Sequence, residues 1–282
     1  MPFLVDSIRI EMNRRNIAIH GLKSTVMNVC RDDKHKLISL SDSLDDIDNA
    51  QAEALIFLEI SLHSQENELK ELRDSLLSVL DEVVRVVKDY KPMMEQVVKI
   101  EKNLQLAVGS VMAPLVKESQ EFIRWLMANH FTFLGYSEYE FVESESGKQL
   151  REVSDKRLGV FAFRNAQQSI IDVSQFNEGM AKFHLVPQII TFSKSSMRSR
   201  VHRHAYSDYV VIKKFNSSGE VIGESRFMGL YTSMVYSLSP IGIPLIREKI
   251  NKVIGRSGLN LNSYYGKSFK QILEIFPRDE IF

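Results

Sequence analysis

The stretch "EFIRWLMANHFTFLGYSEYEFV", residues 121–142, limits the fold more than any other part of this chain. Phe122, Trp125 and Leu126 recur at helical spacing, and this pattern ends at Asn129-His130. An alternating pattern typical of a half-buried strand begins at the next residue. Helical patterns dominate the preceding segments and strand patterns those that follow. The sequence therefore predicts an α+β fold with an antiparallel sheet.

Aromatic side chains occupy alternate positions of this predicted strand, at Phe131, Phe133, Tyr139 and Phe141. Since strand side chains alternate between faces, the four are predicted to share one face, with Gly135 and Ser137 in its middle. Small residues between large ones could admit a crossing helix or a small ligand. Core packing is the preferred interpretation, because aromatic residues dominate ordinary cores. The partners would be Phe122, Trp125 and Leu126 of the preceding helix.

Charge and cysteine content exclude several classes of protein. The 282 residues carry 36 Lys plus Arg and 36 Asp plus Glu, so no bulk field favours nucleic acid or a membrane surface. Cys30 is the only cysteine, which rules out a disulfide within the chain and predicts a cytoplasmic setting. Cys30 is interpreted as a small core residue. No apolar run approaches the roughly 20 residues that cross a bilayer.

The first 130 residues are predicted to alternate between helix and strand. A helix is expected over 2–15, a strand with a kink at Gly21 over 16–29, and a hairpin or loop over 31–52. A strand over 54–63 has an apolar centre and is predicted to be buried on both faces. The remaining expectations are a long helix capped by Ser64 and ending before Pro92, then helices over 93–108 and 114–129.

The rest of the chain is predicted to be a sheet followed by helices. Candidate strands cover 131–142, 157–163, 185–193, 199–214 and 220–236. A turn is expected at "FNSSGEVIGE", with Gly219 at positive φ. Two helices are expected at the end, one opened by Pro244 and one over 266–276.

No catalytic or cofactor-binding residue can be assigned from the motifs. Gly266-Lys267-Ser268 resembles the tail of a phosphate-binding loop, but no glycine precedes it at position 261. The chain has neither a GxGxxG fingerprint nor a GxSxG nucleophile elbow. No nucleotide cofactor is therefore expected in these residues.

Two groups of side chains contain residue types that can bind metal ions. His202 and His204 lie two apart and would share a strand face, with Asp208 as a third donor. No fourth ligand is visible. An acidic loop offers four carboxylates, but its spacing does not fit a calcium loop; they are Asp42, Asp45, Asp46 and Asp48. Both groups are interpreted as solvated, and no metal site is assigned.

A basic segment gives the nucleic-acid alternative. Its cations are Arg198, Arg200, Arg203, Lys213 and Lys214. Such a strand could grip phosphates, but the neutral balance of the whole chain argues against nucleic-acid binding. The preferred interpretation is a wet strand face whose arginines pair with nearby carboxylates.

Several phrases together resemble the large multidomain bacterial NAD-specific glutamate dehydrogenases. They are "MPFLVDSI", "FIRWLMANHFTFLGYSEYEF", "SRVHRHAYSDYVVIKKFNSSGEVIGESRFMGLYTSMVYS", "IPLIREKINKVIGRSGL" and "ILEIFPRDEIF". The resemblance implies the N-terminal, non-catalytic region of that enzyme, with the NAD-binding and catalytic domain downstream in the same polypeptide. It also implies a homo-oligomer and an amino-acid effector, or alternatively a structural scaffold without a ligand.

The resemblance further implies a division into four parts. Residues 1–91 would be an ACT-like, ferredoxin-like domain lacking its first strand, so that Met1 begins inside a domain and leaves a sheet edge for a neighbour to cover. A helical connector over 92–130 would lead to an antiparallel, PAS-like or ACT-like domain over 131–240 and to helices over 241–282.

Overall fold

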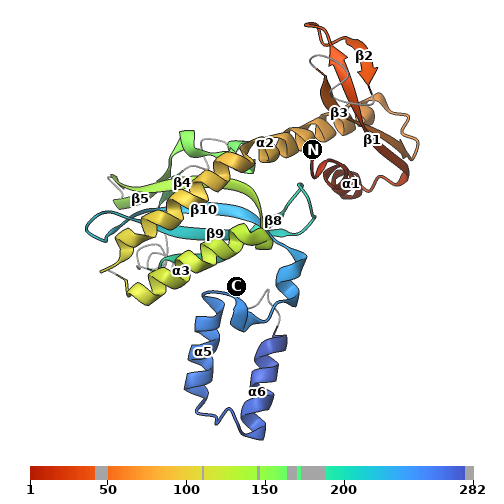
Figure 1. Cartoon of the computed structure of the whole chain (residues 1–282). Helices are drawn as coiled ribbons and strands as arrows, with labels where there is room; N and C mark the ends of the chain where they lie inside the picture. The colour runs from red at the N-terminus through yellow and green to blue at the C-terminus, as the bar shows by residue number, and fades with distance from the viewer. Residues whose placement is uncertain (42–49, 110, 145–146, 164–169, 173–187, 277–282) are drawn as a thin grey trace. The chain divides into compact units, whose positions relative to one another are not determined.

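The computed structural model describes residues 1–41, 50–109, 111–144, 147–163, 170–172 and 188–276 (Figure 1). The chain forms two compact units. The N-terminal unit contains Met1–Val87 and Ser199–His204, and the sheet unit contains Lys88–Arg198 and Ala205–Phe282. Both combine helices with antiparallel sheets, so the predicted α+β class is confirmed.

A three-stranded sheet and two helices make the N-terminal unit. The strand order is β2 (Leu37–Ser41), β1 (Ile19–Arg31) and β3 (Gln51–Ile60). The helices are α1 (Leu4–Arg14) and the first part of α2 (Glu66–Asn103). Ile8, Met12 and Leu72 form the core against one sheet face. The β1–β3 register shifts between Ile19 and Gly21, which confirms the predicted kink.

The prediction that the third strand is buried on both faces is wrong. Ile56, Leu58 and Ile60 pack into the core, whereas Leu55 and Phe57 are 54% and 59% exposed. Alternate side chains point to opposite faces, and the helices cover only one face of this sheet. The apolar residues at the centre of β3 therefore lie on one buried face and one exposed face of the sheet.

The predicted break at Pro92 is also wrong, because α2 runs through Pro92 without interruption. Proline removes one backbone donor and usually kinks or ends a helix. Buried side chains on both sides of the proline outweigh that cost, with Val83 and Val86 before it and Met93 and Val97 after it. Tertiary packing, rather than local propensity, stabilises most protein helices.

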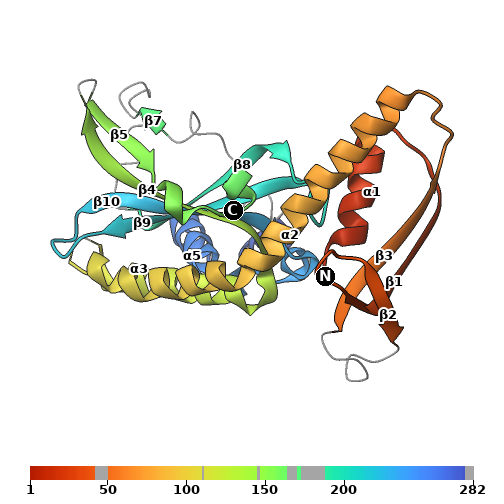
Figure 2. The ribbon, with the colours of Figure 1, turned by 90° about the horizontal axis from the view of Figure 1, so that it is seen from above.

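The sheet unit is built on a seven-stranded antiparallel sheet. Its order is β7 (Ile170–Asp172), β5 (Gly147–Glu152), β4 (Phe131–Ser144), β10 (Val221–Tyr231), β9 (Tyr206–Phe215) and β8 (Ile190–Arg198), while β6 (Leu158–Gly159) also pairs with β4. The second part of α2 and α3 (Ala113–Trp125) cover one face of this sheet (Figures 1 and 2). Gly219 takes a φ of 78° in the β9–β10 turn, as predicted.

A bulge in β4 corrects the predicted alternation of its aromatic side chains. Phe133 pairs with Gly229 and Gly135 with Met228, so Leu134 is one residue too many on its strand. Before the bulge the odd-numbered side chains point to the helix-covered face of the sheet, and beyond it the even-numbered ones do. Tyr136 joins Phe131 and Phe133 in the core beneath the helices. A Cβ added to Gly135 would instead meet Val160 and Phe161 on the opposite face.

The aromatic residues around the start of β4 do fill a core, as the preferred interpretation holds. The Trp125 and His130 rings stack with centroids 4.3 Å apart. Phe131 and Phe133 meet edge to face at 5.0 Å. Asn129, with a φ of 63°, makes the reversal between the last helical turn and β4. Phe122 and Leu126 are buried in the same core.

Four predicted strands differ from the observed ones. The strand predicted over 220–236 ends at Tyr231, and a 3-10 turn over Ser233–Ser237 follows it. The strand predicted over 199–214 begins only at Tyr206, because the preceding residues form a series of bends in which His202 has a φ of 70°. The strand predicted over 157–163 is only two residues of β6 followed by a 3-10 turn over Val160–Phe163. The strand predicted over 185–193 begins at Ile190 and extends to Arg198; positions 185–187 lie outside the described residues.

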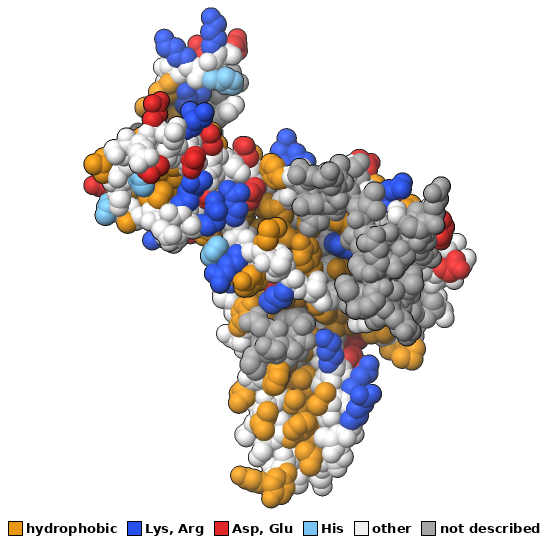
Figure 3. Space-filling model, turned by 180° about the vertical axis from the view of Figure 1, so that it is seen from behind, with side chains coloured by type: hydrophobic (Ala, Val, Ile, Leu, Met, Phe, Trp, Pro, Cys, Tyr) orange, Lys and Arg blue, Asp and Glu red, His pale blue; other side chains and the backbone are white. Residues whose placement is uncertain are grey.

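Two amphipathic helices end the described chain, α5 (Ile246–Ser257) and α6 (Tyr264–Ile275). Figure 3 shows apolar side chains gathered over this end of the sheet unit. The exposed apolar residues on and next to α6 are Tyr264, Tyr265, Ile272, Ile275 and Phe276. Of the helices that the structure describes, none has the length and hydropathy needed to span a bilayer.

A buried carboxylate ties together three segments of the N-terminal unit. Glu11 in α1 accepts a 2.9 Å hydrogen bond from Arg14 Nε, another from Ser75, and lies 3.5 Å from Arg200 Nε. Burial alone would raise the pKa of Glu11. The hydrogen bonds and the positive charges outweigh burial and lower this pKa from 4.5 to about 2.

The Glu11 network predicts acid sensitivity of the N-terminal unit. A carboxyl whose pKa is lower in the folded state stabilises the fold fully above its unfolded pKa, and this contribution is lost as protons bind. We therefore expect stability to fall as the pH drops from about 4.5 towards 2. The Glu11→Gln variant should be less stable at neutral pH and show a flatter dependence over that interval. Urea unfolding at stepped pH measures both, and parallel curves for variant and wild type would contradict the assignment.

Candidate functional site

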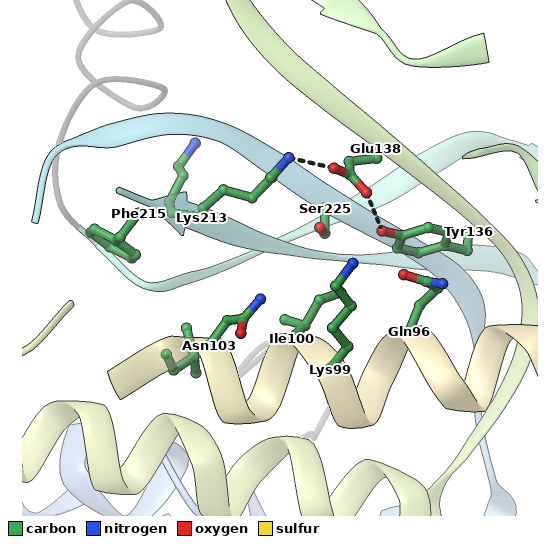
Figure 4. A pocket seen from close by; sticks show the side chains of 11 residues that line it. Gln96, Lys99, Ile100, Asn103, Tyr136, Glu138, Lys213, Phe215 and Ser225 are labelled. Atoms are coloured by element: carbon green, nitrogen blue, oxygen red, sulfur yellow. Dashed lines mark hydrogen bonds and ion pairs between the residues drawn. The ribbon is translucent and has the colours of Figure 1, made fainter. Parts of the chain in front are cut away.

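A polar pocket lies in the sheet unit between the second part of α2 and the sheet (Figure 4). Its volume is about 140 Å³. The helix contributes Gln96, Lys99, Ile100 and Asn103, and the 3-10 turn after it contributes Leu104. The sheet contributes Tyr136, Glu138, Lys213, Lys214, Phe215 and Ser225. A concave site with a few converging polar groups is the usual form of a small-molecule site.

The helix wall presents a row of polar side chains with no partner in the described part of the chain. Gln96, Lys99 and Asn103 are spaced three and four residues apart, which places them on one side of α2. Figure 4 shows all three pointing from the helix toward the sheet. None has a hydrogen bond or ion pair among the described residues. The row therefore offers one ammonium and two amides to a bound molecule.

The sheet wall, by contrast, is a fixed network centred on a carboxylate. Tyr136 Oη donates to Glu138 Oε2 at 3.0 Å, and Lys214 Nζ donates to the other oxygen of Glu138 and, at 3.0 Å, to Glu140. Burial raises the pKa of Tyr136, so its phenol stays protonated. Burial would raise the pKa of Glu138 too, but the Lys214 hydrogen bond and charge lower it below its ordinary value. Glu138 is therefore ionised at neutral pH.

The neighbouring lysine, Lys213, forms an ion pair with a different carboxylate, Glu224. Its ammonium donates to Glu224 Oε2 at 2.6 Å, and neither side chain is exposed. Burial lowers the pKa of Lys213. Arg226 Nε donates to the second oxygen of Glu224 at 2.6 Å. Lys99 is thus the cation of the pocket that the described residues leave uncompensated.

The motifs considered in the sequence do not assemble into a site. Ser263 caps α6 by accepting a 3.1 Å bond from the Gly266 N–H, so Gly266-Lys267-Ser268 is helical and not a phosphate loop. Cys30 lies half-buried in β1, rather than in the core as predicted. Asp42, Asp45, Asp46 and Asp48 lie outside the described residues.

The histidine pair does not form the strand face that a metal site would need. His202 and His204 lie in the bends before β9 and not on a strand. Asp208 accepts a 2.7 Å bond from Lys194. Among the residues that the structure describes, no group of three or more His, Cys, Asp or Glu side chains could hold a metal ion.

The basic segment does not form one exposed strip either. Arg200 donates to Glu82 at 2.8 Å, Lys213 is buried against Glu224, and Lys214 is held by Glu138. The Arg200–Glu82 pair is an arginine–carboxylate contact of the kind that the preferred interpretation predicts. The predicted wet strand face is wrong, because Arg200 lies in the bends before β9 and Lys213 is fully buried. The nucleic-acid alternative has no support in this geometry.

Sequence reasoning missed the pocket, although one signal was present. Gln96, Lys99 and Asn103 form a polar row beside the buried positions Met93 and Val97 of the same helix. The opposite wall could not be foreseen. Without the bulge, Tyr136 would be assigned to the face away from the helices.

Comparison with protein families first defines the class. Residues 1–76 match the family model described as "Glutamate dehydrogenase, ACT1 domain". Residues 243–282 match the model described as "Glutamate dehydrogenase, helical motif 1". The N-terminal unit, with its helix-strand-strand-helix core, is therefore ACT-like, as predicted.

Two curated relatives are similar to the whole length of this chain. The NAD-specific glutamate dehydrogenase of Halomonas elongata is 39% identical over 286 residues, which cover 100% of this chain and 18% of the relative. That of Pseudomonas aeruginosa is 38% identical over 282 residues, covering 100% of this chain and 17% of the relative. By sequence the chain corresponds to a region of the large NAD-specific glutamate dehydrogenases, and spans less than a fifth of their length.

Proposed function

We propose that this chain is the N-terminal regulatory and assembly region of an NAD-dependent glutamate dehydrogenase, and is not catalytic by itself. The parent polypeptide would convert L-glutamate and NAD to 2-oxoglutarate, ammonia and NADH in the cytoplasm. The relatives support the parent activity, and the ACT1 match supports regulation. The sequence supports the non-catalytic role, since it lacks a dinucleotide fingerprint.

The observation that carries a regulatory role is the pocket beneath α2. Its helix wall has polar groups left without partners while its sheet wall is already ordered. A pocket wall whose side chains are already ordered loses little conformational entropy when a ligand binds to it. A bound effector that favours one conformation of the parent enzyme could change affinity at a distant site by about 1–3 kcal/mol.

Assembly is supported by the open edge of the N-terminal sheet. β3 ends the strand order among the described residues, and an apolar groove of about 710 Å³ lies beside it, lined partly by Leu55, Ile56 and Leu80. Open edges are templates for pairing with another chain. We propose that a second copy covers this edge in a homo-oligomer. The four-part division at 91, 130 and 240, with a PAS-like third part, remains part of this proposal.

Two measurements on residues 1–282 test the proposal. We expect no glutamate-dependent formation of NADH, because the sequence has no dinucleotide-binding fingerprint. Calorimetry with a panel of amino acids should give binding heat for at least one of them. NADH formation by this region alone would refute the non-catalytic role. Absence of heat with every compound would favour the alternative, a structural scaffold.

A further inference from the structure

We propose that the pocket beneath α2 binds a small zwitterionic amino acid. Lys99 would hold the carboxylate, Glu138 would face the ammonium group, and the amides of Gln96 and Asn103 would complete the hydrogen bonds. This inference deepens the proposed regulatory function, because it assigns that function a ligand class and a site.

The argument begins with charge on opposite walls. Lys99 projects from the helix into the pocket, and Glu138 lies on the sheet wall facing it (Figure 4). Glu138 is ionised, because its pKa is below the ordinary value. A ligand with one charge of each sign can pair with both walls. A dicarboxylate would place its second negative charge against Glu138.

Hydrogen-bonding capacity points to the same class. Glu138 accepts one bond on each oxygen, from Tyr136 and Lys214, and its Oε2 also lies 3.5 Å from the Lys156 ammonium, but an ionised carboxylate has about four acceptor positions. It can therefore still accept from a ligand N–H. Lys99 has three donors and no partner in the described chain. Gln96 and Asn103 can each donate and accept, so they suit either end of the ligand.

Size excludes larger ligands. The pocket holds about 140 Å³, well below the roughly 300–1,000 Å³ of sites for drug-sized molecules. Ile100, Leu104 and Phe215 give the pocket an apolar end, which suits a short aliphatic side chain.

Calorimetry on the 282-residue chain with L-alanine and L-serine tests the assignment. Lys99→Gln should weaken binding at least tenfold, since it removes the cation that meets the carboxylate. Lys102→Gln, an exposed lysine of the same helix outside the pocket, should leave binding unchanged. L-Lactate, which replaces the ammonium of alanine by a hydroxyl, should bind at least tenfold more weakly than L-alanine. Asn103→Leu is a second variant should Lys99→Gln fold poorly.

Several outcomes would overturn this inference while leaving the proposed function intact. One is succinate or inorganic phosphate binding more tightly than either amino acid, which would make the pocket an anion site. Another is amino-acid binding that Lys99→Gln and Asn103→Leu both leave unchanged, which would place the ligand elsewhere. Binding of neither amino acid, with heat from a different compound in the panel, would also remove this ligand class. Only NADH formation, or no heat from any compound, counts against the proposed function itself.

Discussion

Replacing Glu224 by glutamine is expected to lower the free energy of unfolding of the sheet unit by about 3–5 kcal/mol. Glu224 is fully buried and accepts from Lys213 and from Arg226, each at 2.6 Å. Glutamine keeps the shape of the side chain but removes its charge. Two cations would then lie next to a neutral amide, and an uncompensated buried charge is far more costly than a missing hydrogen bond.

The other half of the pair gives a matched comparison. Lys213→Met should cost less than Glu224→Gln, because Glu224 keeps its bond to Arg226, and Arg226 also lies over the Tyr139 ring at 4.1 Å. Glu53→Gln, which breaks the exposed pair with Arg31, is the control and should destabilise the protein far less, because solvent screens an exposed pair. Urea unfolding measures all three. Equal losses for Glu224→Gln and Glu53→Gln would contradict the predicted importance of the buried pair.

Gly159→Ala is expected to cost about 2–5 kcal/mol, the second large effect. Gly159 has a φ of 61°, a conformation that costs an L-residue about 1–2 kcal/mol. A Cβ there would lie 2.1 Å from the Leu134 carbonyl oxygen, so β6 would have to move away from β4. Overpacking of this kind costs about a further 1–3 kcal/mol. The shift would also strain the 2.8 Å bond from the Gly159 N–H to Asp89.

Gly242→Ala provides the control for this prediction. Apart from its two chain neighbours, no atom of the described residues lies within 4 Å of the position its Cβ would take, and its φ is not in the positive region. Its stability should change by less than about 0.5 kcal/mol, as for ordinary surface substitutions. Thermal unfolding followed by circular dichroism compares the two variants. A Gly159→Ala protein as stable as Gly242→Ala would show that β6 can shift without cost.

Local sequence patterns predicted where helices and turns occur more accurately than they predicted which faces of these elements are buried. The helix signals at Pro114 and Pro244 and the turn at Gly219 depend on nearby residues, and the structure confirms them. The prediction from Pro92 is wrong because tertiary contacts of Met93 and Val97 keep the helix continuous, and the local sequence does not show those contacts. The exposure of Leu55 and Phe57 depends on which sheet face the helices cover, and the strand itself does not encode that.

The candidate site was harder to predict than the fold. Its residues come from α2, the 3-10 turn after it, β4, β9 and β10, and most are ordinary surface types in isolation. Glu138 and Lys214 lie 76 positions apart, and nothing in either segment indicates that they meet. Only the strand register of the folded sheet brings them together. Motif searches detect short-range spacing, so a site built from long-range pairing escapes them.

The extra residue at Leu134 has a consequence for evolution and engineering. Deleting it would restore strict alternation along β4. Because Leu134 is the residue without a pairing position on β10, every later side chain would keep its side, and the Tyr136 phenol and the Glu138 carboxylate would still line the pocket. Homologous chains that lack only this residue should therefore keep the same pocket side chains, whereas loss of one paired residue earlier in β4, such as Thr132, would turn the phenol and the carboxylate to the opposite face.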